Sequence, residues 1–231
     1  MIEAVILAGG LGTRLRSVVR DRPKPMAPVS GRPFLEIVLT MLARKGFERI
    51  VLSLGHLSDV VVNHFGGVFA GMELVYEIER TPLGTGGALR CALHRCDTDH
   101  VLVVNGDTFL DIEAHDVEAM WKVDGTPIIV AKKLPDTSRY GRLEVADGRI
   151  AGFVEKGDSG SGLINAGYYV LPTEMATRFP PDTAFSLESD FLAKEVVKRG
   201  FRIFVSSGLF IDIGVPDDYM RAQSELVEAY C

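Results

Sequence analysis

The sequence predicts an α/β fold: a Rossmann-like, doubly wound and mainly parallel sheet with helices on both faces. Two observations predict it. Short apolar segments alternate with segments of helical periodicity from the start of the chain, as in the βαβ units of a parallel sheet. The segment at 101–104 is apolar throughout, which is typical of a strand buried on both faces. Ligands of such sheets bind beyond the carboxyl ends of the strands.

In the first half of the chain, strands and helices are predicted in alternation. The strands are expected at 4–8, 49–54, 74–78 and 101–104, and the helices at 34–42, 57–65 and 88–93. Gly46 stands where the first helix would end, as glycine often does at a helix C-terminus. The turn at 9–14 and the segments 83–87 and 105–108 should then meet at the carboxyl edge of the sheet.

The second half is less regular. Strands are expected at 127–132, 142–145, 149–154, 164–171, 202–206 and 209–213, with helices around Trp121, at 187–198 and from Pro216 onward. Asp147-Gly148 between two of these strands is a strong hairpin signal. Residues 157–162, rich in glycine and serine, predict a surface loop. Gly200 should end the helix predicted at 187–198.

Composition places limits on the function. The chain has 231 residues, which fits one domain at 1–231 with a small accessory hairpin. A net charge of −6 argues against a nucleic-acid partner, because no excess of cations is present to meet phosphates. Cys91, Cys96 and Cys231 match neither a zinc pattern nor a disulfide framework. The sequence shows no signal peptide or membrane-spanning segment, so a cytoplasmic protein with no membrane partner is expected.

A glycine-rich turn follows the first predicted strand. It contains Gly9, Gly10 and Gly12, and then Thr13 and Arg14. Glycines let the backbone approach a ligand closely, and successive N–H groups in such a turn can form a concave anion site. The alternative is a turn that only connects the strand to a helix.

Cations accompany this turn. Arg14 can supply a planar two-pronged donor, and Lys24 a point charge whose position is restricted by Pro23 and Pro25. A buried strand, glycines and cations in this order predict a site for a polyphosphate. The turn is not a P-loop, because Arg14-Leu15 stands where that motif has Gly-Lys. It is not a dinucleotide fingerprint either, because Leu15 stands where that motif has its last glycine.

Two aspartates are candidate metal ligands. Asp107 ends the fourth predicted strand, and Asp212 lies between apolar residues before a helix start. Mg²⁺ is typically bound by one or two carboxylates together with substrate phosphates. The alternatives are that Asp107 caps a turn with Thr108, and that Asp212 accepts backbone hydrogen bonds at the helix start.

Residues 7–15 together with 23–26 resemble the signature of the sugar-1-phosphate nucleotidylyltransferases. Members of that family make nucleoside-diphosphate sugars from a nucleoside triphosphate and a sugar 1-phosphate. The resemblance implies a GT-A-like version of the fold, with residues 1–110 mainly binding the nucleotide and 111–231 mainly binding the sugar phosphate. Residues 212–219 match the family pattern Asp-Ile-Gly-x-Pro-x-x-Tyr, which implies that Asp107 and Asp212 hold Mg²⁺. The chain departs from many members at Ser17, where they have proline, and this allows the turn a different path.

The resemblance also implies roles for individual residues. Arg14 should hold the leaving phosphates, and Lys24 should bridge the α-phosphate and the attacking group, so both are expected to be catalytic. Nucleotide contacts are expected from Leu7, Ala8, Gly9, Gly10, Gly12, Thr13, Glu79, Pro82, Gly84, Thr85 and Gly86. The Glu79 carboxylate can accept hydrogen bonds from guanine N1–H and the amino group, which would favour GTP over UTP. An exposed strand-end glutamate is the alternative.

Sugar-phosphate contacts are implied for a second set of residues. They are Asn105, Gly106, Gly141, Glu155, Lys156 and Asn165. Glu155 would accept from sugar hydroxyls, Lys156 would contact the sugar phosphate, and Asn165 can both donate and accept. The segment 139–141 is expected to act as a lid over the ligand.

Longer matches at 22–36, 82–88 and 105–109 look most like the D-glycero-α-D-manno-heptose 1-phosphate guanylyltransferases. The implied reaction joins GTP and the heptose 1-phosphate to give GDP-heptose and pyrophosphate, for capsule, S-layer or lipopolysaccharide assembly. Mannose-1-phosphate guanylyltransferase and N-acetylmuramate-1-phosphate uridylyltransferase remain alternatives. So do a nucleotide-sugar-sensing subunit without turnover and a cytidylyl- or molybdopterin-type transferase. The sequence does not determine the oligomeric state, and a homo-oligomer is one of the alternatives.

Overall fold

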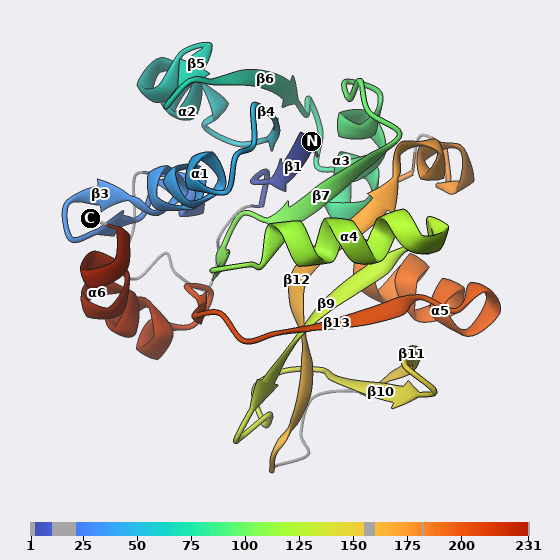
Figure 1. Cartoon of the computed structure of the whole chain (residues 1–231). Coiled ribbons are helices and arrows are strands. Elements are labelled where there is room, and N and C mark those ends of the chain that lie inside the picture. Colours follow the sequence, from blue (N-terminus) through green and yellow to red (C-terminus); the bar gives the residue numbers. More distant parts are fainter. Residues whose placement is uncertain (1–2, 11–21, 155–159, 182, 231) are drawn as a thin grey trace.

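A computed structural model describes residues 3–10, 22–154, 160–181 and 183–230 (Figure 1). Within them the predicted α/β fold is confirmed, with helices packed around a ten-stranded sheet. The strands in spatial order are β10 (Arg142–Ala146), β11 (Arg149–Val154), β13 (Arg202–Ser206), β9 (Ile128–Leu134), β12 (Gly162–Pro172), β7 (His100–Asn105), β1 (Glu3–Leu7), β4 (Arg49–Leu54), β6 (Met72–Ile78) and β5 (Val68–Phe69). Two short pairs lie outside it, β2 (Pro28–Val29) with β3 (Arg32–Pro33) and β8 (Thr108–Leu110) with β14 (Phe210–Asp212).

The two halves of the sheet differ in strand direction. β7, β1, β4 and β6 run parallel, as the alternating pattern of the first half predicts. In the second half β9 and β13 are parallel, but β12 lies between β7 and β9 and is antiparallel to both. β12 begins at Gly162, shortly after the β10–β11 hairpin ends at Val154, and this connection is shorter than the roughly dozen residues that a crossover to a parallel strand needs. The mainly parallel arrangement therefore holds for the half of the sheet that contains β1.

Helices cover both faces of the sheet, as expected for a doubly wound fold. One face is covered by α1 (Phe34–Arg44), α2 (Ser58–Phe65), α4 (Ala114–Asp124) and α6 (Pro216–Tyr230). The other is covered by α3 (Gly84–Leu93), the 3₁₀ turn η3 (Thr173–Arg178), the π-helix η4 (Leu187–Leu192) and α5 (Ala193–Arg199). Strand β1 alternates between the two cores: Ala4 and Ile6 face the first, and Val5 and Leu7 the second.

Turns form where the local chemistry predicts them. Gly46 and Gly200, which follow α1 and α5, have positive φ angles of 85° and 66°. Asp147 and Gly148 have φ angles of 50° and 72°, the left-handed pair that a tight β10–β11 hairpin requires. The helix predicted at 187–198 begins with the six-residue π-helix η4 instead of a regular α-helical turn.

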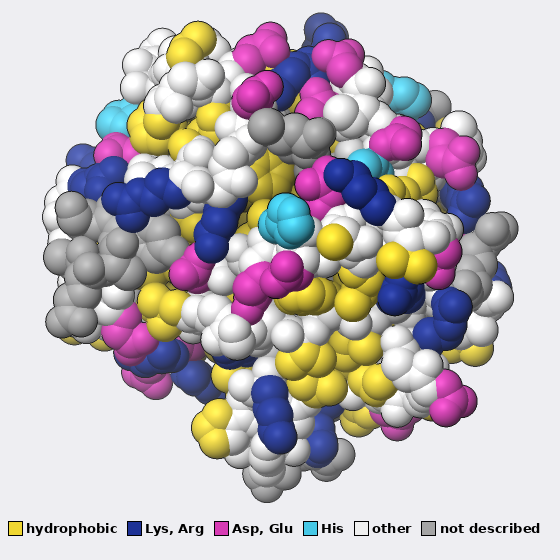
Figure 2. All heavy atoms as spheres, viewed as in Figure 1, with side chains coloured by type: hydrophobic (Ala, Val, Ile, Leu, Met, Phe, Trp, Pro, Cys, Tyr) yellow, Lys and Arg dark blue, Asp and Glu magenta, His cyan; other side chains and the backbone are white. Residues whose placement is uncertain are grey.

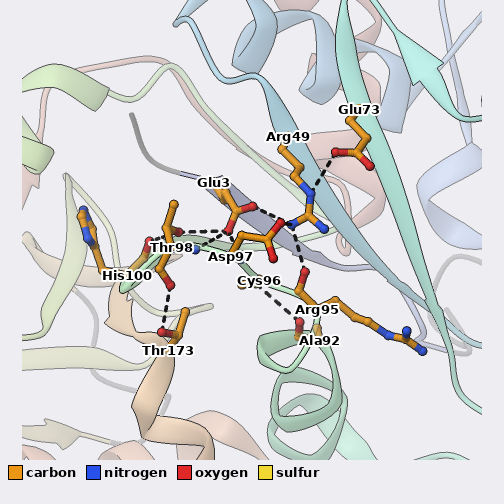
Figure 3. A network of polar contacts seen from close by, with 10 residues as sticks. All are labelled: Glu3, Arg49, Glu73, Ala92, Arg95, Cys96, Asp97, Thr98, His100 and Thr173. Carbon is orange, nitrogen blue, oxygen red and sulfur yellow. Dashed lines mark hydrogen bonds and ion pairs between the residues drawn. The ribbon is translucent and has the colours of Figure 1, made fainter.

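A network of polar contacts fixes the amino end of the parallel strands (Figure 3). Arg49 donates to Glu3 at 2.5 Å and to Glu73 at 3.0 Å, which joins β1, β4 and β6. The other Glu3 carboxylate oxygen accepts from the backbone N–H groups of Asp97 and Thr98 at 2.8 and 3.1 Å. These contacts lie at the amino end of β1, so they anchor the strand whose other end leads into the glycine turn.

The surface carries side chains of both charges. On the face seen in Figure 2, cationic and anionic side chains are interspersed and form no continuous basic area. None of the helices among the described residues is long and apolar enough to cross a membrane.

Candidate functional site

The site begins where β1 and β7 end side by side. Leu7 is in register with Asn105, and the Gly106 N–H donates to the Leu7 carbonyl at 2.9 Å. A Cβ on Gly106 would lie 2.7 Å from that carbonyl oxygen and 3.0 Å from the Ala8 Cα. A side chain at position 106 would therefore push the two strand ends apart, which explains the glycine between Asn105 and Asp107.

Lys24 reaches this edge from the turn after the glycine segment. It opens the 3₁₀ turn Lys24–Met26, and its ammonium lies 2.5 Å from the Asp107 Oδ2. The Lys24 side chain is only 10% exposed, while that of Asp107 is 35% exposed. The other Asp107 oxygen accepts from the Thr108 hydroxyl at 3.3 Å, so the predicted turn contact with Thr108 is present as well.

Asp212 is brought to the same place by the short β8–β14 pair. Asp212 is in register with Thr108, and the Ile213 N–H donates to the Asp107 carbonyl at 3.0 Å. The Asp212 carboxylate accepts from the Gly214 N–H at 2.7 Å, which is the type of backbone contact expected in the alternative reading of this residue. The structure therefore brings the two segments that carry the predicted metal ligands together, although they come from distant parts of the sequence.

Gly214 links the lysine and the second aspartate. A Cβ at this position would lie 2.8 Å from the Lys24 Nζ and 2.8 Å from the Asp212 Oδ1. Real Cβ atoms essentially never approach other heavy atoms this closely, so only glycine leaves both charged groups where they are.

A cavity of about 150 Å³ opens beside Lys24 and Asp107. It is lined by Leu7, Ala8, Gly10, Lys24, Pro25, Thr85, Asn105, Gly106 and Asp107. A ligand, catalytic or metal contact is predicted from the sequence for each of these residues except Pro25. A larger cavity of about 510 Å³ lies at the amino end of β7, is lined by residues such as Asp99, Trp121 and Thr173, and contains none of the predicted residues. The smaller cavity is the candidate site, because in sheets of this kind ligands bind at the carboxyl ends of the strands.

Glu79 lies beside the glycine turn and is half-buried, so it is not the exposed strand-end residue of the alternative. Its Oε2 accepts from the Leu83 N–H at 2.9 Å, and its Oε1 is 2.5 Å from the position of a Cβ on Gly9. Burial raises the pKa of the Glu79 carboxyl, and the hydrogen bond from Leu83 only partly opposes this effect.

The glycines of the segment at 83–87, for which nucleotide contacts are predicted, also have a packing role. A Cβ on Gly84 would lie 2.4 Å from the Phe185 carbonyl oxygen, and one on Gly86 2.0 Å from the Phe185 ring. Both glycines are therefore required by the packing of Phe185 against the start of α3. Pro82 is exposed and does not line the cavity.

Sequence reasoning missed Glu188, which lies in η4 close behind the cavity. Its carboxylate accepts from Thr85 and Ser186 through one oxygen and from Asn105 and Tyr169 through the other. No local signal distinguishes Glu188 from an ordinary helix residue, because its partners lie up to 103 positions away.

Asn165 joins this network indirectly. Its Nδ2 donates to the Tyr169 hydroxyl at 2.8 Å, and its Oδ1 accepts from the Gly167 N–H at 3.0 Å. Burial and the nearby Glu188 carboxylate raise the pKa of Tyr169 well above its ordinary value, so this hydroxyl stays protonated. Asn165 is thus connected to the cavity through Tyr169 and does not line it.

The expected lid at 139–141 is attached to the last helix. Asp218, which is 1% exposed, accepts from Arg139 at 3.2 Å, Tyr140 at 2.9 Å and Arg221 at 2.9 Å. The backbone of Gly141 follows directly at the start of the hairpin. These contacts connect the segment before β10 to the helix that follows Asp212.

Five predicted contact residues lie outside the described part of the chain. They are Gly12, Thr13, Arg14, Glu155 and Lys156. Ser17 and residues 157–159 of the predicted loop at 157–162 lie outside it too.

The donor set suits a hard cation that also binds phosphate. The β8–β14 pair brings the backbones of Asp107 and Asp212 together, so each can turn a carboxylate toward the same edge. Among the described residues there is no cluster of three or more His, Cys, Asp or Glu side chains that could hold a metal alone. Two carboxylates with room for phosphate oxygens fit Mg²⁺, which is seldom enclosed by protein ligands only.

Comparisons with known proteins show the family to which the chain belongs. Residues 3–229 match the family model described as nucleotidyl transferase. D-glycero-alpha-D-manno-heptose 1-phosphate guanylyltransferase of Aneurinibacillus thermoaerophilus is 39% identical, over 97% of this chain and 98% of the relative. The enzyme of the same name from Campylobacter jejuni is 38% identical, over 94% and 97%.

A solved structure shows the same relationship. The crystal structure of HddC from Yersinia pseudotuberculosis superposes with a TM-score of 0.88 at 38% identity, and covers 97% of this chain and 99% of HddC. HddC has also been solved in complex with GMP-PN. The family match spans nearly all of the chain, and it includes the strand ends that carry the candidate site. The chain is therefore an enzyme that belongs to the nucleotidyl transferase family.

Proposed function

We propose that this enzyme transfers the guanylyl group of GTP to D-glycero-α-D-manno-heptose 1-phosphate, giving GDP-heptose and pyrophosphate. The observation that carries the chemistry is the pairing of Lys24 with Asp107 at the wall of a cavity beside Gly10, with Asp212 placed next to Lys24 at Gly214. The choice of substrates is supported by the relatives at 38–39% identity that span the whole chain and by the GMP-PN complex of HddC. GDP-heptose would serve glycan assembly such as that of capsule, S-layer or lipopolysaccharide, and we place the reaction in the cytoplasm, where GTP is made.

The reaction needs no covalent intermediate. A phosphate oxygen of the sugar 1-phosphate attacks the α-phosphorus of GTP, and the bond to the bridging oxygen of the β-phosphate breaks. The electron pair of that bond leaves with pyrophosphate. No strong base is required because the attacking oxygen is already ionised, so catalysis rests on positioning and on stabilisation of charge.

The charged side chains have distinct roles in this proposal. Lys24 bridges the α-phosphate and the incoming sugar phosphate, and Arg14 holds the β- and γ-phosphates. Burial of the Lys24 side chain keeps its charge in a restricted position. Asp107 and Asp212 would hold Mg²⁺, which when bound would neutralise charge on the phosphate oxygens.

The nucleotide occupies the β1 side of the cavity. Backbone groups of Leu7, Ala8, Gly9, Gly10, Gly12 and Thr13 surround the phosphates and ribose, and Pro82, Gly84, Thr85 and Gly86 flank the base. The Glu79 carboxylate, whose Oε1 faces Gly9, accepts from guanine N1–H with one oxygen and from the amino group with the other. Uracil lacks this pair of donors, so the contact favours GTP over UTP.

The sugar phosphate approaches from the β12 side. We assign its contacts to Asn105, Gly106, Gly141, Glu155, Lys156 and Asn165. Asn105 and Gly106 line the cavity next to Asp107, which supports their place at the junction between the two substrates. The attachment of 139–141 to Asp218 supports a lid role for the segment that contains Gly141.

Pyrophosphate release tests the proposal. The assay combines GTP, UTP, dTTP, CTP and ATP, each with Mg²⁺, with heptose, mannose, glucose and N-acetylmuramate 1-phosphates. We expect release with GTP and the heptose 1-phosphate above every other pair. Preferred turnover of another pair would keep the mechanism and replace the substrate. No release from folded protein with any pair would instead favour a sensing subunit without turnover.

A further inference from the structure

Glu188 is the meeting point of the two halves of the candidate site. Its Oε2 accepts from the Thr85 hydroxyl at 2.9 Å and from the Ser186 hydroxyl at 3.2 Å. Its Oε1 accepts from the Tyr169 hydroxyl at 3.2 Å and from the Asn105 Nδ2 at 3.3 Å. Thr85 and Asn105 line the cavity, one from the start of α3 and the other from the end of β7.

These four contacts define what Glu188 can do. An ionised carboxylate has about four acceptor positions on its two oxygens. All are taken by protein donors, and Glu188 is not among the residues that line the cavity. Glu188 therefore acts on ligands through Thr85 and Asn105 and not by direct contact.

The carboxylate also sets the orientation of the Asn105 amide. The amide nitrogen faces Glu188, while the Asn105 Oδ1 is buried and has no hydrogen-bond partner among the described residues. A buried carbonyl oxygen without a partner is unfavourable. The opposite orientation would place that oxygen against the carboxylate, so the charge on Glu188 selects the orientation that is present.

The local backbone is unusual at this point. Glu188 belongs to the π-helix Leu187–Leu192, and π-helical turns are rare and often occur at functional sites. The Leu187 N–H, at the start of this helix, donates to the Thr85 hydroxyl at 2.8 Å. The π-helix is thus attached to the start of α3 by two contacts that share the Thr85 oxygen.

We propose that Glu188 is a positioning residue that holds Thr85 and Asn105, and so aligns the nucleotide side of the cavity with its sugar-phosphate side. The proposal rests on the proposed function for its kinetic consequence. It predicts that the effects of Glu188 and Asn105 on turnover are coupled, because one acts through the other.

A double-mutant cycle tests this coupling in the full-length enzyme. Glu188→Ala should lower kcat/KM for the sugar phosphate by about 10- to 100-fold, as small misplacements of reacting groups do. In an Asn105→Ala background the same change should cost at least about threefold less, because one of the two cavity groups that Glu188 positions is already gone and only Thr85 remains. Glu174→Gln removes a carboxylate that is 76% exposed, and it should leave kcat/KM within about twofold of the wild type. Fully additive effects of Glu188→Ala and Asn105→Ala would overturn the proposal.

A second measurement separates this proposal from the proposed function. The side-chain amide signals of Asn105 are identified in ¹H–¹⁵N spectra of labelled enzyme by their loss in Asn105→Ala. They should move in both Glu188→Ala and Glu188→Gln, and stay in place in Glu174→Gln. If the signals move in these variants but the wild-type enzyme turns over no substrate pair, the proposed function is refuted and the positioning role is supported. Unmoved signals in folded Glu188→Gln would overturn the positioning role whatever the turnover.

Discussion

The Lys24 ammonium lies 2.5 Å from the Asp107 carboxylate, a contact between residues 83 positions apart. The lysine is nearly buried and the aspartate is partly exposed, so the positive charge is fixed at the cavity wall while the carboxylate still faces solvent. Because phosphate oxygens prefer fixed cations in a water-poor site, this pair marks where transferred phosphate would lie.

Lys24→Ala should abolish most turnover and leave the fold intact. We expect kcat to fall by at least about 100-fold, as for loss of a group that stabilises transition-state charge. The free energy of unfolding should fall by about 1 kcal/mol or less, because Asp107 is exposed enough to be hydrated without its partner. Steady-state kinetics and chemical denaturation measure the two effects.

A matched pair elsewhere provides the control. Lys45 lies 2.7 Å from Asp111, with side chains 30% and 36% exposed, and neither residue lines the cavity. Lys45→Ala should therefore keep kcat within about twofold of the wild type. Equal losses of kcat in Lys24→Ala and Lys45→Ala would show that Lys24 has no special role.

Gly214→Ala should lower turnover through a single added methyl group. The new Cβ would lie 2.8 Å from both the Lys24 Nζ and the Asp212 Oδ1, so at least one of these groups must move. We expect kcat/KM to fall by about 10- to 100-fold, since displacement of reacting groups by about 1 Å has effects of this size. Gly67→Ala is the control, because a Cβ there meets no atom within 4 Å. Unchanged kinetics in Gly214→Ala would contradict this account of the site.

Glu79→Gln should alter the choice of nucleotide. A glutamine cannot accept from both guanine donors, so kcat/KM for GTP should fall by about 10- to 100-fold while that for UTP changes little. Because burial raises the pKa of Glu79, GTP affinity should be full above that pKa and fall as the pH drops through it. Competition assays with both nucleotides at several pH values measure these effects. Glu77→Gln is the control at a pH above the Glu79 pKa, because Glu77 lies within β6, before Glu79, and is paired with Arg95. A parallel loss with GTP and UTP would refute base recognition by Glu79.

Glu3 should make stability depend on pH in the acid range. Burial alone would raise the pKa of Glu3, but hydrogen bonds from Arg49 and from the backbone at 97–98 outweigh this and lower it below 4.5 (Figure 3). The unfolded state therefore binds this proton more readily than the folded state. Stabilisation by Glu3 should be complete above pH 4.5 and be lost as the pH falls through the lowered folded pKa. Urea unfolding of the wild type and Glu3→Gln at several pH values measures the free energy of unfolding of each. A difference between the two that does not change with pH would contradict the prediction.

Much of the site follows from local sequence because its parts lie at strand ends. Apolar runs locate β1 and β7, and the residues directly after them, Gly10 and Asp107 among them, must then lie at one edge of the sheet. Lys24 is recognisable from the two prolines that flank it. The direction of β12 was not predictable in this way, because an apolar strand has the same alternation in either direction.

Other features depend on contacts between distant segments. Phe185, which requires glycine at positions 84 and 86, lies about a hundred residues from them in sequence, and apolar pattern alone gives it no special place. Glu188 is similar, since it falls inside a segment that reads as an ordinary amphipathic helix. Only the folded arrangement of α3, β7, β12 and η4 shows that this carboxylate connects the two sides of the cavity.

The discrimination between two sugar phosphates tests the central claim most directly. With GTP and Mg²⁺, kcat/KM is measured for D-glycero-α-D-manno-heptose 1-phosphate and for mannose 1-phosphate, which lacks one carbon and its hydroxyl. We predict a preference of at least about tenfold for the heptose, the scale expected for recognition of one additional group. An equal or greater kcat/KM for mannose 1-phosphate would contradict the assignment of heptose as the substrate.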